Sequence, residues 1–143
     1  MTKTIFLAAG AIVLVFLAAG TFLRNQNAPL NLTLESLSGD KLASDEETLL
    51  VDIRTPGEWQ QTGVIEGALL VTYSDADSFL AAVIPHLEQG QRIALVCRSG
   101  NRSSRAARQI AGQTEAPVID VAGGMIRIIN EGYHPVPPDR VTH

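Results

Sequence analysis

A single cysteine stands at a point of this 143-residue chain where its sulfur could do chemistry. Cys97 directly follows the apolar run 93–96 and opens the polar stretch Cys-Arg-Ser-Gly-Asn-Arg-Ser-Ser, which ends at Ser104. A thiolate is a strong nucleophile, and nearby cations and helix N-termini stabilise it. A lone thiol can form neither an internal disulfide nor a multi-cysteine zinc site, so Cys97 is either buried packing or a reactive centre.

The residues that follow Cys97 have the composition of an anion-binding loop. Backbone N–H groups between a strand and a helix can converge on the loop's centre, and the helix N-terminus adds partial positive charge. The loop also holds two arginines and small residues that let the backbone curl. We expect it to hold Cys97 as a thiolate and to bind an anionic substrate. The residues expected to bind this substrate are Arg98, Ser99, Gly100, Asn101, Arg102 and Ser103. Ser103 could instead be only the N-cap of the next helix.

The elements that must position this loop are short apolar strands alternating with helical segments. We expect strands at 30–34, 49–53, 67–71, 93–96 and 118–121, and helices at 78–87, 102–111 and 125–130. A further short helix should begin at Pro56, because Thr55 and Glu58 can form a capping box around it. This alternation predicts an α/β fold with a mainly parallel sheet. Ligands of such sheets bind beyond the carboxyl ends of the strands, which is where Cys97 lies.

The first segment of the chain is suited to a membrane. Residues 5–23 contain no charged side chain, and at about 1.5 Å per residue they span about 30 Å, the thickness of a bilayer's hydrocarbon core. This length favours an uncleaved anchor. The small residues Ala18, Ala19 and Gly20 resemble the end of a cleaved signal peptide, which remains the alternative. Either function would carry the rest of the chain across the cytoplasmic membrane, to the periplasmic or another extracytoplasmic side.

The composition of the chain and its proline-containing segments indicate the domain boundaries. We divide the chain into a signal peptide or anchor at 1–24, a linker at 25–29, one α/β domain at 30–138 and a tail at 139–143, with extended structure expected from Pro135. The formal net charge of −4 gives no indication of a nucleic-acid partner.

The loop and its neighbours resemble the single-domain rhodaneses, or thiosulfate sulfurtransferases, from about Leu30 to Val136. The matching pieces are Cys-Arg-Ser-Gly-Asn-Arg-Ser at 97–103, Asp-x-Arg-x-Pro-x-Glu-Trp at 52–59, Gly63 with Ile-Glu-Gly-Ala at 65–68, Gly-Gly at 123–124, and Tyr133 with Pro135. The sequence departs from the family pattern at Val64, where histidine is usual, at Ile128, where tryptophan is usual, and at the inserted His134. These departures concern packing more than the loop.

The resemblance implies a three-layer rhodanese-like fold, with helices on both faces of the sheet, and a two-step reaction. Cys97 would attack the outer sulfur of thiosulfate or a similar donor, sulfite would leave, and cyanide or a thiol would take the sulfur from the Cys97 persulfide. The loop amides and Arg102 would hold the anions, and no metal or organic cofactor is implied. Asp52 and Arg54 would form a structural ion pair, with Arg54 a candidate for the pocket rim.

Three other functions compete with this interpretation. In phosphatases and arsenate reductases of the same fold, the active-site loop has the pattern Cys-x-x-x-x-x-Arg, with arginine six positions after cysteine. Here that position is Ser103 and the arginine, Arg102, is one position earlier, which counts against phosphate chemistry. A partner-binding module without enzyme activity and a sulfur relay to one dedicated protein acceptor stay open as alternatives.

Overall fold

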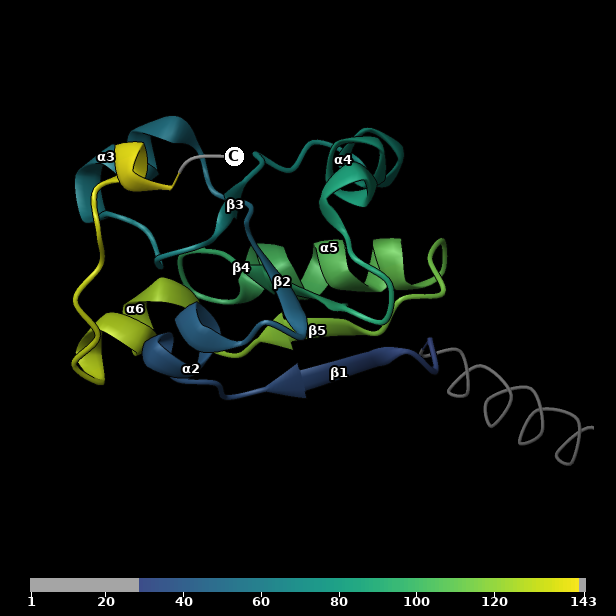
Figure 1. Ribbon diagram of the computed structural model, residues 1–143, viewed down its shortest axis with the longest axis horizontal. Coiled ribbons are helices and arrows are strands. Elements are labelled where there is room, and N and C mark those ends of the chain that lie inside the picture. Colours follow the sequence, from purple (N-terminus) through teal and green to yellow (C-terminus); the bar gives the residue numbers. More distant parts are fainter. Residues whose placement is uncertain (1–28, 142–143) are drawn as a thin grey trace, which may run out of the picture.

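Five strands form one parallel sheet in the computed structural model, which describes residues 29–141 (Figure 1). The sheet order is β1-β5-β4-β2-β3, and every pairing between these strands is parallel. The strands are β1 (Leu32–Glu35), β2 (Thr48–Asp52), β3 (Leu69–Leu70), β4 (Arg92–Val96) and β5 (Val118–Val121). All five lie within or beside the predicted segments, so the expected α/β fold with a parallel sheet is confirmed.

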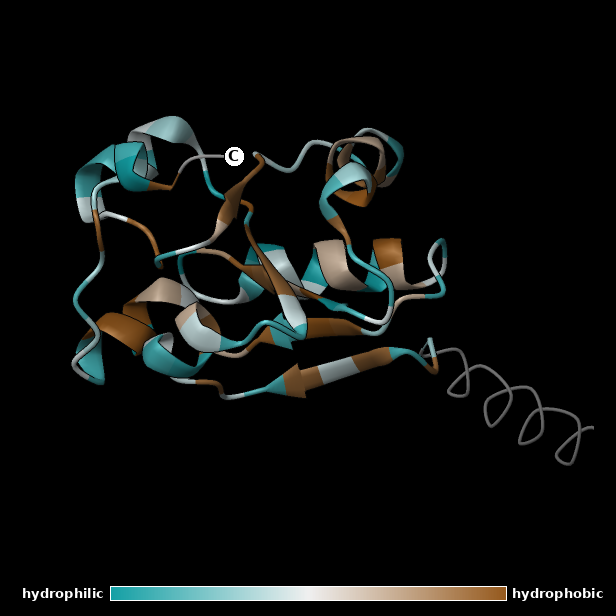
Figure 2. Cartoon of the chain, in the orientation of Figure 1, coloured by the Kyte–Doolittle hydropathy of each residue, from teal (hydrophilic) through white to brown (hydrophobic). Residues whose placement is uncertain are grey.

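Burial on both faces explains the apolar sequence of the central strands. Leu-Leu-Val in β2, Ile-Ala-Leu-Val in β4 and Val-Ile at the start of β5 are hydrophobic in Figure 2, and the inner part of each strand is buried. Continuous apolar runs are typical of parallel strands that have helices on both sides. At the edge of the sheet, apolar and polar residues alternate in the sequence of β1, and Leu34 is 70% exposed.

Two helices cover each face of the sheet. On one face α4 (Ala76–Val83) and α5 (Asn101–Ala111) pack Phe79, Val83 and Ile110 against the strands. On the other face α2 (Gly39–Ser44) and α6 (Gly124–Asn130), which lie side by side in Figure 1, contribute Leu42, Met125 and Ile128. The result is the three-layer arrangement implied by the sequence resemblance.

α5, the helix that follows the Cys97 loop, packs on the sheet through a face made mostly of small residues. Its buried residues recur at spacings of three and four, the pattern of a helix packed on one side. They are Ser103, Ala106, Ala107, Ile110 and Ala111. Because most of them are small, the helix axis can approach the sheet closely and bring its first turn near the strand ends.

The capping signal at the third helix is confirmed. α3 (Pro56–Thr62) begins after Thr55, whose hydroxyl accepts from the Glu58 N–H while the Glu58 carboxylate accepts from the Thr55 N–H. Trp59 is only half-buried, because α3 stands at the end of the sheet and none of its residues is fully buried.

Three details differ from the sequence-based prediction. The six-residue helix α2 was not expected; Ser38 caps it and Leu42 is its main buried side chain. α4 begins at Ala76 rather than at 78, because the Asp75 side chain caps it, and it passes into the short 3-10 helix η1 (Ile84–His86) at Pro85. The chain after Pro135 is extended at Val136, which pairs with Val64, and at Pro137, and it then turns through the 3-10 helix η2 (Pro138–Arg140).

The predicted anchor or signal segment, 1–24, lies outside the described residues, as does most of the predicted linker. Within 29–141, no helix has the length and apolar character needed to cross a bilayer.

Candidate active site

The loop that carries Cys97 lies at the carboxyl end of the middle strand. β4 ends at Val96, between β5 on one side and β2 on the other, and Cys97 is the next residue. α5 begins at Asn101, so the chain turns from strand to helix within the intervening loop. This is the edge of a parallel sheet at which ligands bind.

Backbone N–H groups surround the Cys97 sulfur. The side chain is 1% exposed, and Sγ accepts from the N–H of Gly100, at N···Sγ 3.1 Å, and from that of Ser103, at 3.4 Å. Ser103 is the third residue of α5, and the first N–H groups of a helix have no acceptor within it. Donors in this position stabilise negative charge on a sulfur atom.

Glycines allow the loop to close around the sulfur. Gly100, not Ser103, is the N-cap of α5, and its φ of 95° lies in the left-handed region that glycine tolerates. A Cβ at Gly124 would lie 2.8 Å from the backbone of Arg98, so only glycine fits where α6 meets the loop. The Met125 N–H donates to the Cys97 carbonyl at 2.8 Å, which joins α6 to the loop backbone.

The buried carboxylate of Asp120 is connected to the Cys97 sulfur through the Ser103 hydroxyl. Ser103 is fully buried, and its Oγ lies 3.6 Å from Cys97 Sγ, 3.0 Å from the Gly100 carbonyl and 2.7 Å from Asp120 Oδ1. Asp120 comes from β5 and is 5% exposed. The sequence analysis did not select Asp120. The signal that could have found it is a charged residue inside the apolar strand Val-Ile-Asp-Val, since unpaired carboxylates are seldom buried.

The Arg102 side chain forms an ion pair with a carboxylate of α3. Its guanidinium donates twice to the Glu58 carboxylate of α3, at 2.9 and 2.5 Å. The hydrogen bond from Arg102 is the main reason that the pKa of Glu58 falls to about 2, and the same bond raises the pKa of Arg102. Arg102 was expected to hold the substrate. The structure places its side chain in an ion pair that connects the loop with α3.

Arg54 is bound within the protein. Its side chain is 1% exposed, and it donates to both carboxylate oxygens of Asp52, to Thr62 Oγ1 at 2.6 Å and to the Gly63 carbonyl at 2.8 Å. The predicted structural ion pair is therefore present. It ties the end of β2 to the carboxyl end of α3.

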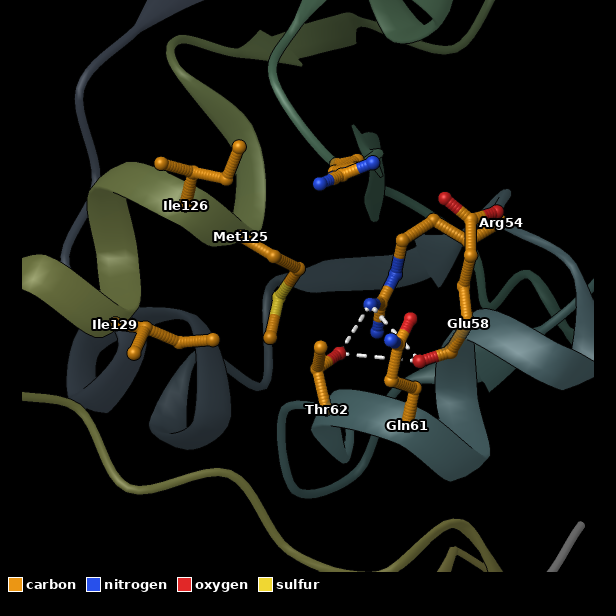
Figure 3. A pocket seen from close by; sticks show the side chains of 8 residues that line it. Arg54, Glu58, Gln61, Thr62, Met125, Ile126 and Ile129 are labelled. Carbon is orange, nitrogen blue, oxygen red and sulfur yellow. Dashed lines mark hydrogen bonds between the residues drawn. The ribbon is translucent and has the colours of Figure 1, made fainter.

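Two cavities flank the loop. The first, about 220 Å³, lies between α3 and α6 and is lined by Met125, Ile126 and Ile129 of α6. Figure 3 shows Met125 and Ile129 on one side of it and Arg54 and Thr62 on the other. Arg98 also lines this cavity, and Arg54 contributes to its wall as the sequence suggested.

The second cavity, about 290 Å³, lies on the α5 side of the loop. Arg102 and Arg105 line it, together with residues that follow β2 and β3. Each cavity thus contains at least one arginine of the loop or of its helix. The side chains of Ser99 and Asn101 are exposed.

Comparison with known proteins identifies what this arrangement resembles. The sequence pattern of the rhodanese-like domain matches residues 36–134. A protein of Allochromatium vinosum named as a sulfurtransferase is 34% identical over 105 residues, which cover 73% of this chain and 92% of that protein.

Solved structures share the fold. A rhodanese-related protein from Thermoplasma volcanium is 29% identical, with a TM-score of 0.51 over 69% of this chain and 94% of that one. A Rhodopseudomonas palustris protein of unknown function, described as a possible tyrosine phosphatase, is 23% identical with a TM-score of 0.58, over 72% of this chain and 84% of that one. At this level of identity the second likeness concerns the fold alone.

Proposed function

The chain belongs to the rhodanese-like domain family, and from that premise we propose that it is a sulfurtransferase in which Cys97 carries the transferred sulfur as a persulfide. The observation that carries the proposal is the environment of Sγ: two backbone N–H donors face it, at the carboxyl end of the central strand. Such donors suit an atom that must be a thiolate before the reaction and hold an anionic sulfur after it.

The first half-reaction takes the sulfur from an anionic donor, for which thiosulfate is our proposal. The Cys97 thiolate attacks the donor's outer sulfur, a new S–S bond forms at Sγ, and the old S–S bond breaks with its electron pair leaving on sulfite. Arg98, which lines the cavity between α3 and α6, attracts the donor by its charge. Arg102 acts less directly, since Glu58 already neutralises much of its charge.

The second half-reaction passes the sulfur to an acceptor, which we propose to be a thiol or cyanide. The acceptor attacks the outer sulfur of the persulfide, and the bond to Sγ breaks with its electron pair staying on Cys97. The apolar side chains Met125, Ile126 and Ile129 on one wall of the first cavity suit the organic part of a thiol acceptor.

Phosphate transfer is the weaker alternative. In the family members that act on phosphate, the loop has arginine at the sixth position after cysteine. In this chain that position is Ser103, which is buried beneath the sulfur and bonded to Asp120, while the arginine one position earlier is paired with Glu58. The cation that a phosphate group would need at the sixth position is therefore replaced by a buried hydroxyl.

The proposal is tested by following the sulfur directly. The purified full chain is reduced and incubated with thiosulfate, and its intact mass is measured by mass spectrometry. In a parallel assay, sulfite release is followed with cyanide as acceptor. We expect the wild type to gain one sulfur atom and release sulfite, because Cys97 is the only thiol of the chain.

Cys97→Ser is the matched control, since it changes one atom at the centre of the loop. It should gain no sulfur and release no sulfite. A folded, reduced wild type that neither gains sulfur nor turns thiosulfate over would remove thiosulfate as donor. Polysulfide and a persulfidated protein would then be tested in the same assay, and failure of all of them would favour a binding module.

A further inference from the structure

We propose that Asp120 and Ser103 form a proton relay for Cys97, in which the three groups share one proton between the sulfur and the carboxylate. This inference rests on the proposed function and deepens it, since it assigns the source of the proton for the thiol and its destination. The relay needs contacts in series, and the structure has them: Sγ to Ser103 Oγ at 3.6 Å, and Oγ to Asp120 Oδ1 at 2.7 Å.

Burial makes the sharing of one proton favourable. Cys97 is 1% exposed and Asp120 5% exposed, and both contact the same hydroxyl. Two like charges this close together, with little water to screen them, disfavour each other strongly. One proton shared through Ser103 gives two combinations with a single negative charge: a thiol with a carboxylate, or a thiolate with a carboxylic acid.

The Ser103 hydroxyl can serve both combinations by reversing its hydrogen bond. When Cys97 is a thiol, S–H donates to Oγ and the Ser103 hydroxyl donates to the Asp120 carboxylate. When Cys97 is a thiolate, the Asp120 carboxylic acid donates to Oγ and the hydroxyl donates to the sulfur. One hydroxyl hydrogen thus always points to the negative group, and no buried polar atom of the three loses its partner.

Few of the surrounding charged side chains are free to interact with Cys97 and Asp120. Most charged side chains of the neighbouring elements are engaged elsewhere: Arg102 with Glu58, Arg54 with Asp52, Arg127 with Glu131, and Arg92 with Glu35 and Asp45. Arg98, on the loop, lines the first cavity and adds positive potential from the solvent side. Asp120 forms no ion pair within residues 29–141, so Ser103 is its link to the site.

The relay acts in both half-reactions. In the first, the thiol proton passes to Ser103 as the hydroxyl proton passes to Asp120, and the thiolate attacks the donor. In the second, the S–S bond at Sγ breaks, its electron pair returns to Cys97, and the Asp120 proton moves back through Ser103 to the sulfur. Asp120 touches no substrate, so it is a positioning residue that acts through Ser103.

The first test measures the rate of Cys97 alkylation by iodoacetamide between pH 5 and pH 10, a range chosen to contain the titration of an ordinary thiol, about pH 8.5. Asp120→Asn removes the charge and offers Ser103 a permanent donor, so its midpoint should move to lower pH by about one unit or more. Ser103→Ala removes the hydroxyl donor, so its midpoint should move to higher pH. A structural role alone would change thermal stability and leave both midpoints at the wild-type value.

The second test separates the half-reactions in single-turnover experiments. In Asp120→Asn the pH midpoint of sulfur uptake from thiosulfate should fall together with the alkylation midpoint, because uptake needs the Cys97 thiolate. In Ser103→Ala that midpoint should rise, and transfer from the preformed persulfide to a thiol should slow by about 10-fold or more, because the departing thiolate loses the hydroxyl donor. The double variant with Ser103→Ala should be no slower in this step than Ser103→Ala alone, as expected of groups that work in series.

Wild-type alkylation midpoints in folded variants, or uptake midpoints that do not follow the alkylation midpoints, would overturn the relay. Should Asp120→Asn not fold, a wild-type midpoint in Ser103→Ala would still overturn it. Alkylation needs no sulfur donor, so the relay can be judged even if thiosulfate proves not to be the substrate. If the wild type takes up no sulfur but the variants show the expected shifts of the alkylation midpoint, thiosulfate is excluded as the donor and the relay is still supported.

Discussion

The ion pair between Arg102 and Glu58 changes the part that the loop's second arginine can take in the reaction. Its guanidinium donates to both Glu58 oxygens, and Glu58 also caps α3 through Thr55. One carboxylate therefore holds the first turn of α5 and the first turn of α3 together. Arg102 is 45% exposed, so solvent screens the pair and its direct contribution to stability is small, of the order expected for surface pairs.

This ion pair should make stability depend on pH in the acid range. The pKa of Glu58 is lowered from 4.5 to about 2, so the folded state binds its proton less well than the unfolded state. The resulting stability is fully present above pH 4.5 and is lost as the pH falls towards 2. We expect Glu58→Gln, which keeps a capping oxygen, to lower the free energy of unfolding by about 0.2–1 kcal/mol at pH 7.

Urea unfolding of both proteins at about pH 7, 4 and 3 checks this, at conditions that approach the lowered pKa. The difference between wild type and Glu58→Gln should shrink as the pH falls. Glu66→Gln, at an exposed carboxylate that forms no ion pair within residues 29–141, is the control and should show no such trend. A difference that stays constant down to the lowest pH would mean that the pair with Arg102 does not stabilise the fold.

At the scale of elements, the start of α6 supports the active-site loop. The N–H groups of Met125 and Ile126 donate to the carbonyls of Cys97 and Arg98, at 2.8 and 3.0 Å. Gly123 and Gly124 both have positive φ, 71° and 58°, which lets the chain turn into α6 while touching the loop. The Gly-Gly pair, recognised in the sequence as a family feature, thus has a structural reason in this contact.

Gly124→Ala should disturb the loop more than the rest of the protein. A Cβ there would meet the backbone of Arg98 at 2.8 Å in a conformation unfavourable to alanine, and we expect a loss of about 1–3 kcal/mol of stability. Since the displaced groups bond to Cys97 and Arg98, sulfur transfer should fall by more than the loss of folded protein explains. Thermal unfolding and single-turnover sulfur uptake measure the two effects.

Gly57→Ala is the matched control for this substitution. Gly57 lies in α3, and a Cβ added there would meet nothing within 4 Å, so alanine should leave stability unchanged or raise it by up to about 1 kcal/mol. Sulfur uptake should stay at the wild-type level. Equal behaviour of the two variants would show that the contact between α6 and the loop is not needed for the site.

At the scale of the whole molecule, the sheet order brings the site together. β4 supplies Cys97, its neighbour β5 supplies Asp120, and its other neighbour β2 leads into Arg54 and α3. All the strands are parallel, so their carboxyl ends meet at one edge. The segments that lie there are far apart in the sequence, and only the pairing of the strands places them around one sulfur atom.

The N-terminal segment should place this domain at or beyond the cytoplasmic membrane. Residues 5–23 have the length and composition for this, and the remaining alternatives are an uncleaved anchor and cleavage after Gly20. In bacterial cells we expect the protein either in membranes that resist a carbonate wash or in the periplasmic fraction, with its mature form beginning at Thr21. Full-length protein in the cytoplasmic fraction would contradict both.

Local signals in the sequence were sufficient for much of the fold. The apolar runs predicted the parallel strands, and Thr55 with Glu58 predicted the start of α3, because each depends on residues close together in the chain. Cys97 and its loop could be selected for the same reason, since strand, loop and helix follow one another directly. The helix α2 was missed because six residues with one main apolar anchor give little periodic pattern.

The sequence by itself therefore determined the strands, the loop and the position of the cysteine that we propose to react, all of which are properties of continuous segments. Only the tertiary structure decided what surrounds that atom: Asp120, 17 positions from Ser103, and Glu58, 44 positions from Arg102. The local sequence marks Asp120 as a charged residue in an apolar strand and Glu58 as a capping residue, but it does not show what either carboxylate contacts, because that contact is set by the group that the fold brings within hydrogen-bonding distance. That group depends on strand order, and strand order is chosen by the packing of both sheet faces together.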